Sequence, residues 1–397
     1  MAEWKTVRLG TIASTNQETY SPKENWQFVN YLDTGNITMN RIDEVQHINT
    51  SMDKLPSRAR RKVKSNSIIY STVRPNQLHY GIIKEQPENF LVSTGFTVID
   101  VNMEKAVPDY IYYVLTQKEI TEHLQAIAEQ SVSAYPSLKP SDIENLEVLL
   151  PDIDTQKETV AILGVIDEKI KQNTEINNNL LEQVLAIYRH RFVDTTNELR
   201  QTCRADEYFD ISIGKTPPRK EPQWFSTNPK DVTWVSISDM GTCGLYISES
   251  SEQLTREAVV RHNVKIVPDN TVLLSFKLTV GRIAITDGEM TTNEAIAHFK
   301  TDKKEINEYL YCYLKCFNYQ TMGSTSSIAT VVNSKIIKGM PFIVPTDEEI
   351  TEFHSLVAPM FAKIKANQTE ISNLTALRDT LLPKLMSGEL DVSDIDL

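Results

Sequence analysis

The sequence lacks the patterns that mark several classes of protein. No apolar run approaches the roughly 18–20 residues that span a bilayer, and the first residues, from Met1 onward, lack the apolar core of a signal peptide. The four cysteines include no C-x-x-C pair, so neither a disulfide framework nor a zinc site is indicated. We therefore expect a protein of the reducing cytoplasm.

Motifs for bond-breaking chemistry are also missing. The sequence contains no G-x-x-x-x-G-K-[ST] phosphate loop and no N-P-P-[YF] or D-P-P-[YF] methyltransferase tetrapeptide. Its Asp167-Glu168-Lys169 imitates half of a Mg²⁺ nuclease pattern, but it falls in a predicted helix instead of a strand. Asp33-Thr34-Gly35 resembles an aspartic protease loop, but its counterpart Asp239-Met240-Gly241 lacks the hydroxyl that supports a carboxylate pair. We expect no catalytic residue and no metal site in this chain.

The net charge of −12 argues against a protein that simply coats DNA, because phosphate contacts require local positive potential. The charges are unevenly distributed, however. Residues 54–64 carry six basic side chains and no acidic one, whereas residues 389–397 carry only acidic charge. Such a run is usually a solvated face, but it also allows one face of an acidic chain to bind nucleic acid.

The two halves of the chain repeat each other. Four segments of the first half match four segments of the second in the same order, and the separation decreases slowly, as small loop insertions would produce. Each half contains short strands with Gly, Pro and Asn turns, then a short helix, then a long helix. Shared strand patterning alone is the simpler alternative. The matched segments are 28–35 with 234–241, 66–71 with 270–275, 109–115 with 308–314, and 143–151 with 337–345.

The long helix at the end of each half carries a seam of about three heptads, which is typical of a coiled coil. Asn173 and Asn367 occupy equivalent seam positions, and a polar seam residue sets register at a cost in stability. We predict that the helices pair with each other, antiparallel, about a pseudo-two-fold axis; separate packing of each helix on its own domain is the alternative. A helix over residues 155–192 would be roughly 57 Å long and would hold two globular domains apart. The seam residues are Ile166, Ile170, Asn173, Asn177, Leu180, Val184, Ile187 and Arg191, and Met360, Ile364, Asn367, Ile371, Leu374, Arg378, Leu381 and Leu385.

With these features the chain resembles the specificity (S) subunits of type I restriction–modification systems over nearly its whole length. The similarity is clearest in the second half, in segments 214–220, 273–285 and 292–296, and in Leu381 to Leu390. The first half departs from the family at residues 71–81, where a longer loop has no counterpart of Lys277. Its long helix also begins with a reduced Pro-rich segment at Pro151.

The resemblance implies an α+β fold with two tandem target-recognition domains, each a twisted sheet with short helices, separated by the paired long helices. The expected boundaries are residues 1–152 for the first recognition domain, 153–194 for the central helix, 195–345 for the second recognition domain, 346–388 for the C-terminal helix and 389–397 for the acidic tail.

The function that the resemblance implies is non-catalytic. Each recognition domain would bind one half of a bipartite DNA site, and the helices would set the gap between the halves. Two methyltransferase subunits would dock on the helices and methylate one adenine in each half, and two translocase–nuclease subunits would join for restriction. S-adenosylmethionine, ATP and Mg²⁺ would be bound by those partners. Two alternatives remain: a recognition subunit of a methylation-only or other multi-subunit modification system, and a coiled-coil scaffold that binds protein alone.

Candidate DNA-binding residues follow from their types and positions. We expect base-edge contacts from residues of the first-half loop, because Arg suits guanine and Asn or Gln suits adenine, and phosphate contacts from the basic run. For each of them an ordinary surface side chain is the simpler alternative. The base-edge candidates are Arg74, Asn76, Gln77 and His79; the phosphate candidates are Arg58, Arg60, Arg61, Lys62 and Lys64; those of the second half are Lys215, Arg219, Lys220, Lys277, Thr279 and Arg282.

Overall fold

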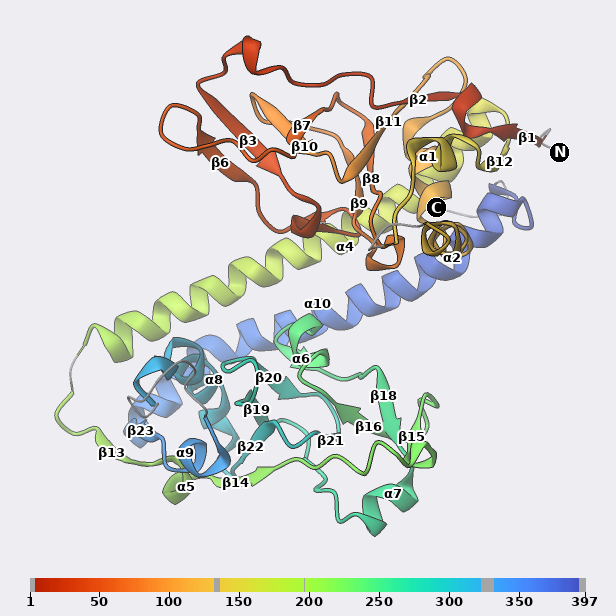
Figure 1. Ribbon diagram of the computed structural model, residues 1–397. Coiled ribbons are helices and arrows are strands. Elements are labelled where there is room, and N and C mark those ends of the chain that lie inside the picture. Colours follow the sequence, from red (N-terminus) through yellow and green to blue (C-terminus); the bar gives the residue numbers. More distant parts are fainter. Residues whose placement is uncertain (1–3, 132–135, 196, 323–331, 393–397) are drawn as a thin grey trace. The chain divides into compact units, whose positions relative to one another are not determined.

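The computed structural model describes residues 4–131, 136–195, 197–322 and 332–392, and it divides into two compact units (Figure 1). Unit 1 is formed by Met1–Glu168 and Leu374–Leu397, and unit 2 by Lys169–Asn373. Each unit therefore contains one predicted repeat and a part of both long helices. In the described part of the chain, no helix has the length and apolar character to cross a membrane. Part of the predicted acidic tail, residues 393–397, lies outside the described residues.

Unit 1 contains a pair of strands, two four-stranded sheets and a small hairpin. The sheet orders are β1-β12, β6-β3-β10-β7, β2-β11-β8-β9 and β4-β5. Its strands are β1 (Lys5–Arg8), β2 (Ala13–Thr15), β3 (Phe28–Leu32), β4 (Ile37–Thr38), β5 (Arg41–Ile42), β6 (Gln46–Asn49), β7 (Ala59–Lys62), β8 (Ser67–Ser71), β9 (Tyr80–Ile83), β10 (Phe90–Ser93), β11 (Phe96–Val101) and β12 (Glu147–Leu150). Its helices are α1 (Pro108–Thr116), α2 (Lys118–Glu129), α3 (Pro140–Glu144), the first part of α4 (Ile153–Tyr188) and the last part of α10 (Asp347–Ser387).

Unit 2 has the sheet orders β13-β23, β14-β22-β19-β20-β17 and β15-β18-β16-β21. Its strands are β13 (Gln201–Arg204), β14 (Asp210–Ile213), β15 (Phe225–Ser226), β16 (Val232–Val235), β17 (Tyr246–Ile247), β18 (Glu252–Leu254), β19 (Val272–Ser275), β20 (Ile283–Thr286), β21 (Thr291–Thr292), β22 (Ile296–Lys300) and β23 (Pro341–Val344). Its helices are α5 (Ala205–Tyr208), α6 (Asp239–Thr242), α7 (Arg256–Arg261), α8 (Asn307–Cys316), α9 (Ser334–Lys338), the rest of α4 and the greater part of α10.

The predicted duplication is confirmed by strand pairing. The order β2-β11-β8-β9 of unit 1 recurs in unit 2 as β14-β22-β19-β20, with all neighbours antiparallel in both. The pairing of β3 with β6 (antiparallel) and β10 (parallel) recurs as that of β16 with β18 and β21. Parallel pairs between otherwise antiparallel strands are an unusual detail. Their recurrence therefore favours duplication of one ancestral repeat and argues against the alternative that the halves merely share a common strand pattern.

The repeats also differ. In unit 1, β7 extends the sheet beyond β10, and it carries much of the basic run. Among the described strands of unit 2, none pairs with β21 on the corresponding side; the short helix α7 and the strand β17 are added elsewhere instead. The two repeats therefore present different elements around a common framework.

Each repeat is closed by pairing of its first and last strands. β1 pairs antiparallel with β12, with Lys5 opposite Leu150, and β13 pairs antiparallel with β23, with Gln201 opposite Val344. The long helix begins within three residues of the last strand in both cases. The start of each repeat is thus held beside the start of its long helix.

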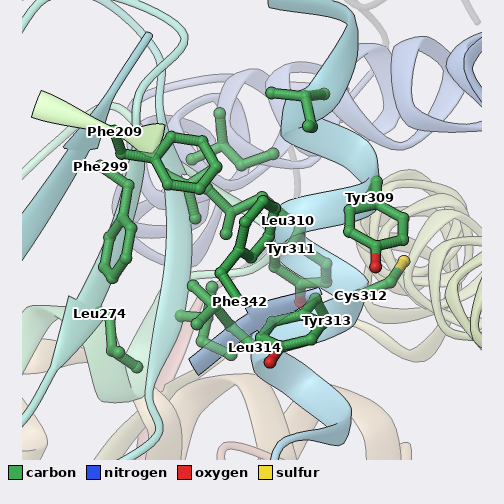
Figure 2. Close-up of a cluster of buried hydrophobic side chains, with 14 of the residues drawn as sticks. Phe209, Leu274, Phe299, Tyr309, Leu310, Tyr311, Cys312, Tyr313, Leu314 and Phe342 are labelled. Atoms are coloured by element: carbon green, nitrogen blue, oxygen red, sulfur yellow. The ribbon is translucent and has the colours of Figure 1, made fainter. Parts of the chain in front are cut away.

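The core of unit 2 forms where α8 packs on the sheet (Figure 2). The aromatic stretch around Cys312 is a buried helix: Tyr309, Leu310, Tyr311 and Leu314 are all nearly inaccessible. Figure 2 shows these side chains facing Phe342 of β23 and, beyond it, Phe209 and Phe299. The apolar side chains of α8 pack against residues of the sheet and of α10 in one cluster, whereas Lys315 near its end is exposed.

The long helices start within two residues of Pro151 and Pro345, because capping side chains follow these prolines. After Pro151, the Asp152 carboxylate accepts hydrogen bonds from the Asp154 and Thr155 amides. After Pro345, Thr346 and Glu349 form a capping box, in which each side chain accepts from the other residue's amide. α10 ends at Gly388, whose φ of +74° terminates the helix in the left-handed region.

The predicted antiparallel pairing of α4 and α10 is confirmed. In unit 2, Asn173 donates to Glu370 (2.9 Å), Asn367 donates to Asn177 (2.8 Å) and Arg191 pairs with Glu352 (3.1 Å), so the partners run in opposite directions. In unit 1, Arg378 contacts Asp167. None of the predicted seam residues is exposed, and Asn173 and Asn367 are buried. The two asparagines contact different partners rather than each other, and their role in register stays a prediction.

A nearly buried ion pair fixes the end of α4 against the start of α10. Arg200 is 8% exposed; it donates to Glu349 (2.8 Å) and to the main-chain oxygens of Arg191 (2.8 Å) and Phe192 (3.2 Å). Burial opposes ionisation of Glu349, but hydrogen bonds from Arg200, Asn197 and the Thr346 amide outweigh it and lower its pKa to about 2.

We predict that Glu349→Gln destabilises the protein at pH 7 by about 2–3 kcal/mol, because it leaves the buried guanidinium without its counter-charge. The Glu349 pKa is lower in the folded chain than its usual 4.5. The stabilisation by the ionised Glu349 carboxylate is therefore complete above about pH 5 and is lost as the pH falls towards 2. In urea unfolding, the difference in the free energy of unfolding between wild type and Glu349→Gln should decrease as the pH is lowered from 5 to 3. Glu352→Gln, in an exposed pair, should change stability by less than about 1 kcal/mol at either pH; a Glu349→Gln gap that is constant with pH would contradict the assignment.

Candidate nucleic-acid interface

The loop between β8 and β9 presents three predicted base-contacting residues together. Arg74, Asn76 and Gln77 are exposed on a single turn of 3₁₀ helix, Pro75–Gln77. The Asn76 amide donates to the Gln125 side chain of α2 (3.2 Å), and Arg74 and Leu78 both have positive φ. The turn is therefore supported from below by a helix, while its polar side chains extend into solvent.

His79 differs from its three neighbours in this loop. Its ring is half-buried, and Nδ1 lies 2.6 Å from the Ile37 main-chain oxygen and 3.4 Å from the Thr38 hydroxyl. The imidazole thus links the hairpin to β4. This position suits a structural role better than the predicted base contact.

The predicted phosphate contacts lie on and around β7. Arg58 is exposed just before the strand, whereas Arg60 and Arg61 are half-buried within it. The Arg60 main-chain oxygen accepts from Tyr20 (2.7 Å), and the Arg61 Nε is buried without a hydrogen-bond partner. Much of the basic run is therefore a strand whose main chain is hydrogen-bonded to its neighbours, and the side chains of Arg60 and Arg61 are partly buried.

Folding also brings acidic side chains to this strand from distant parts of the sequence. Lys62 pairs with Glu24 (2.6 Å) and lies over the Trp26 ring, and the bond from Lys62 lowers the pKa of Glu24. Lys64 lies 3.5 Å from Glu18 and 3.9 Å from Asp100. The sequence run contains no acid, but in the fold two of its five candidate residues already have carboxylate partners.

In unit 2, the β19–β20 hairpin carries Lys277, Thr279 and Arg282. Lys277 and Thr279 are exposed at its tip. Arg282 is half-buried, and its guanidinium donates to the Ile237 main-chain oxygen (2.6 Å) beside Gly241. Lys277 and Thr279 are thus placed to contact a ligand, whereas Arg282 joins the hairpin to the segment before α6.

Arg219 lies in the Pro-rich loop of residues 214–220, where its side chain contacts both an acidic group and two aromatic rings. Its guanidinium binds both carboxylate oxygens of Glu252 (2.8 and 2.9 Å) and stacks on Phe225 and Trp234, with its central carbon 4.1 and 4.7 Å from their ring centroids. A guanidinium with its planar fork already occupied is a poor candidate for bidentate base contact.

The Pro-rich loop and the hairpin tip meet around Glu294. This exposed carboxylate accepts from the Thr216 hydroxyl. Burial opposes its ionisation, but that hydrogen bond and its own amide lower its pKa, and the positive charges of Lys277 and Arg219 act in the same direction. Lys215 donates to the His262 main-chain oxygen (2.6 Å), and Lys220 is exposed. Glu294 therefore relates Lys277 of the hairpin tip to Thr216 and Arg219 of the Pro-rich loop.

The sequence analysis did not identify Glu294 or the aromatic pair of Phe225 and Trp234. Glu294 lies within the segment 292–296 that resembled the family, so its position was available as a signal. No pattern in the sequence placed Phe225 and Trp234 beside Arg219, because their pairing depends on the sheet order β15-β18-β16.

Comparison with known proteins identifies the family. The protein-family model described as "type I restriction modification DNA specificity domain" matches residues 1–182 and 198–376 of this chain. The chain belongs to this family. Members of the family are the non-catalytic DNA-recognition subunits of type I systems, so the DNA-recognition function and the absence of an enzymatic role predicted from the sequence are confirmed.

Individual relatives agree with this assignment. The chain is 24% identical to the type I restriction enzyme HindI specificity subunit of Haemophilus influenzae, over 98% of this chain and 100% of that one. It is 27% identical to the MjaIX specificity subunit of Methanocaldococcus jannaschii, over 76% and 73%. The crystal structure of the type I restriction–modification S subunit from M. genitalium has a similar fold, with a TM-score of 0.58 at 16% identity over 97% of this chain and 96% of that one.

We predict that Arg219→Ala and Lys220→Ala have different effects, although the two residues are adjacent. Arg219→Ala removes an ion pair and two stacked rings, so the melting temperature should fall even without DNA, corresponding to about 1–2 kcal/mol. Lys220→Ala should leave the melting temperature unchanged and weaken DNA binding at low salt. Equal effects of both variants on melting would show that the aromatic contacts of Arg219 are not stabilising.

Proposed function

We propose that this chain recognises a bipartite DNA sequence, each repeat binding one half. The observation that carries the proposal is the recurrence of one strand framework in both units, each with a hairpin loop that displays different exposed polar residues. A shared framework with unlike loops is what two recognition domains for two unlike half-sites require. The exposed loops supply base contacts, and β7 and the Pro-rich loop contact phosphates.

The rest of the proposal concerns partners. Two methyltransferase subunits dock on the long helices and methylate one adenine in each half-site, and two translocase–nuclease subunits join the complex for restriction. The partners bind S-adenosylmethionine, ATP and Mg²⁺, and they supply much of the phosphate contact that an acidic chain lacks. The helices α4 and α10 set the length of unrecognised DNA between the half-sites, and the complex acts in the cytoplasm.

Domain exchange tests the division into two half-sites. Replacing residues 200–344 by the corresponding segment of another family member should change one half of the methylated motif and leave the other half unchanged. This segment contains both β13 and β23, so the closing strand pair is exchanged intact. Sequencing of methylated bases in host DNA gives the motif directly. A change in both halves would show that the repeats do not act independently.

Alanine substitution separates phosphate contacts from base contacts in unit 1. Replacing Arg60 and Arg61 together should weaken binding about equally on matched and mismatched duplexes and lower the salt slope by roughly one to two units. Replacing Arg74 or Gln77 should cost on the order of 1–3 kcal/mol on the matched site and much less where the contacted base is already changed. Affinity of the methyltransferase complex would be measured at several salt concentrations.

The melting temperature of each variant serves as a control, because Arg60 and Arg61 lie in a sheet strand. If base identity altered the effect of Arg60 and Arg61 but not that of Arg74 and Gln77, the two roles would be reversed.

A further inference from the structure

The tip of the β19–β20 hairpin carries an apolar residue in full contact with water. Leu278 is 100% exposed, more than the next most exposed large apolar side chains among the described residues, Met52 at 82% and Val260 at 81%. It stands between Lys277 and Thr279, which are also exposed. A single exposed apolar side chain is ordinary, but one with no part covered, at the end of a projecting hairpin, is not.

The backbone at Leu278 is also unfavourable for leucine. Its φ is +60°, in the left-handed region that Gly, Asn and Asp tolerate and that branched apolar residues rarely adopt. Turn geometry alone would therefore favour a different residue. Neither burial nor backbone preference accounts for leucine here, so we look for a role in binding.

The loop holds Leu278 in this position through several hydrogen bonds. The Ser275 hydroxyl donates to the Thr279 main-chain oxygen (2.7 Å) and accepts from the Arg282 amide (3.0 Å), and the Thr279 amide donates to the Lys277 oxygen (2.7 Å). At the base of the loop, the Arg282 guanidinium is bound to Ile237. These hydrogen bonds fix the conformation of the loop that carries Leu278.

The hairpin of unit 1 offers no equivalent. Leu78 also has a positive φ, of 58°, but its side chain is partly buried and packs against the unit 1 core. An exposed apolar tip is therefore a property of the second hairpin and not of the shared framework.

The shape and chemistry of the tip fit one feature of DNA. β19 and β20 are inner strands of a five-stranded sheet, so it is the loop between them that would enter the major groove, where the apolar group exposed on base edges is the C5-methyl of thymine. Lys277 and Thr279 on either side can donate hydrogen bonds to the acceptors of neighbouring base pairs or to phosphates.

We propose that Leu278 contacts a thymine methyl group in the half-site bound by the second repeat, and so helps determine that half-site. This inference rests on the proposed function. The contact between Leu278 and the methyl group would be apolar, in addition to the polar base contacts expected of the loops.

The test compares wild type and Leu278→Asn in the full chain bound to its methyltransferase partner. Asparagine keeps the left-handed turn and a similar size but removes the apolar surface. The probe is a duplex with the methylated motif of the host, in which each thymine of the second half-site is replaced singly by uracil. In wild type, one replacement should weaken binding about fourfold, the effect of exposing one methyl group. The same replacement should have no effect on Leu278→Asn.

On the all-thymine duplex, Leu278→Asn itself should bind at least about tenfold more weakly than wild type, the lower end of what burying a leucine contributes. Leu199→Asn, at another exposed leucine of unit 2, should bind as wild type does. The melting temperature of Leu278→Asn should be unchanged or higher, because asparagine relieves the backbone strain.

Two results would overturn the inference. One is a uracil effect of equal size in wild type and variant, or no uracil effect in either. The other is weaker assembly of Leu278→Asn with the methyltransferase in the absence of DNA, which would assign the leucine to a protein contact. Failure of the wild-type complex to distinguish matched from mismatched duplexes would instead overturn the proposed function itself.

Discussion

The pairing of the first strand of each repeat with its last strand is the constraint on which the other features depend. β1 with β12 and β13 with β23 bring together residues more than a hundred positions apart, and each pair lies directly before a long helix. Everything between the paired strands forms a loop of fixed ends, so hairpins can lengthen or change composition without moving the helix. Variation of the exposed loops is thereby separated from the helical pairing, where Asn177, Asn367 and the Arg200–Glu349 pair depend on close packing.

Some of the candidate DNA-binding cations already have carboxylate partners within the chain. Lys62 and Lys64 face Glu24 and Glu18, and Arg219 faces Glu252, so each would have to exchange a carboxylate for a phosphate to bind DNA. Such an exchange yields less binding free energy than a phosphate contact by an unpaired cation, because the ion pair within the protein is lost. Binding to arbitrary DNA is weakened most by this arrangement, since it rests on phosphate contacts alone. Intramolecular pairing thus favours discrimination over affinity.

The fold could be predicted well from the sequence where the signal was periodic or repeated. The strands around Ile69 and Leu273, the buried helix at Cys312 and the helix starts after Pro151 and Pro345 follow from local pattern and from the duplication. The state of individual site residues could not, because it depends on partners distant in sequence. No pattern indicated that the Arg282 guanidinium would bond to the Ile237 oxygen, or the His79 ring to that of Ile37; DNA binding by these two residues stays a prediction. Exposure of Leu278 is also a property of the folded hairpin, and its residue type alone predicted the opposite.

The packing of Trp4 has a consequence for chain connectivity. A side-chain carbon placed at Gly388 would lie 2.9 Å from the Trp4 ring, so the stretch that enters β1 and the stretch that leaves α10 are neighbours within unit 1. A linker of a few residues would join them at small entropic cost, because loop-closure entropy is modest for short, pre-positioned ends. The break in the chain could then be moved to the segment between α4 and β13. The packing of Trp4 within unit 1 therefore does not depend on which of the two repeats is encoded first.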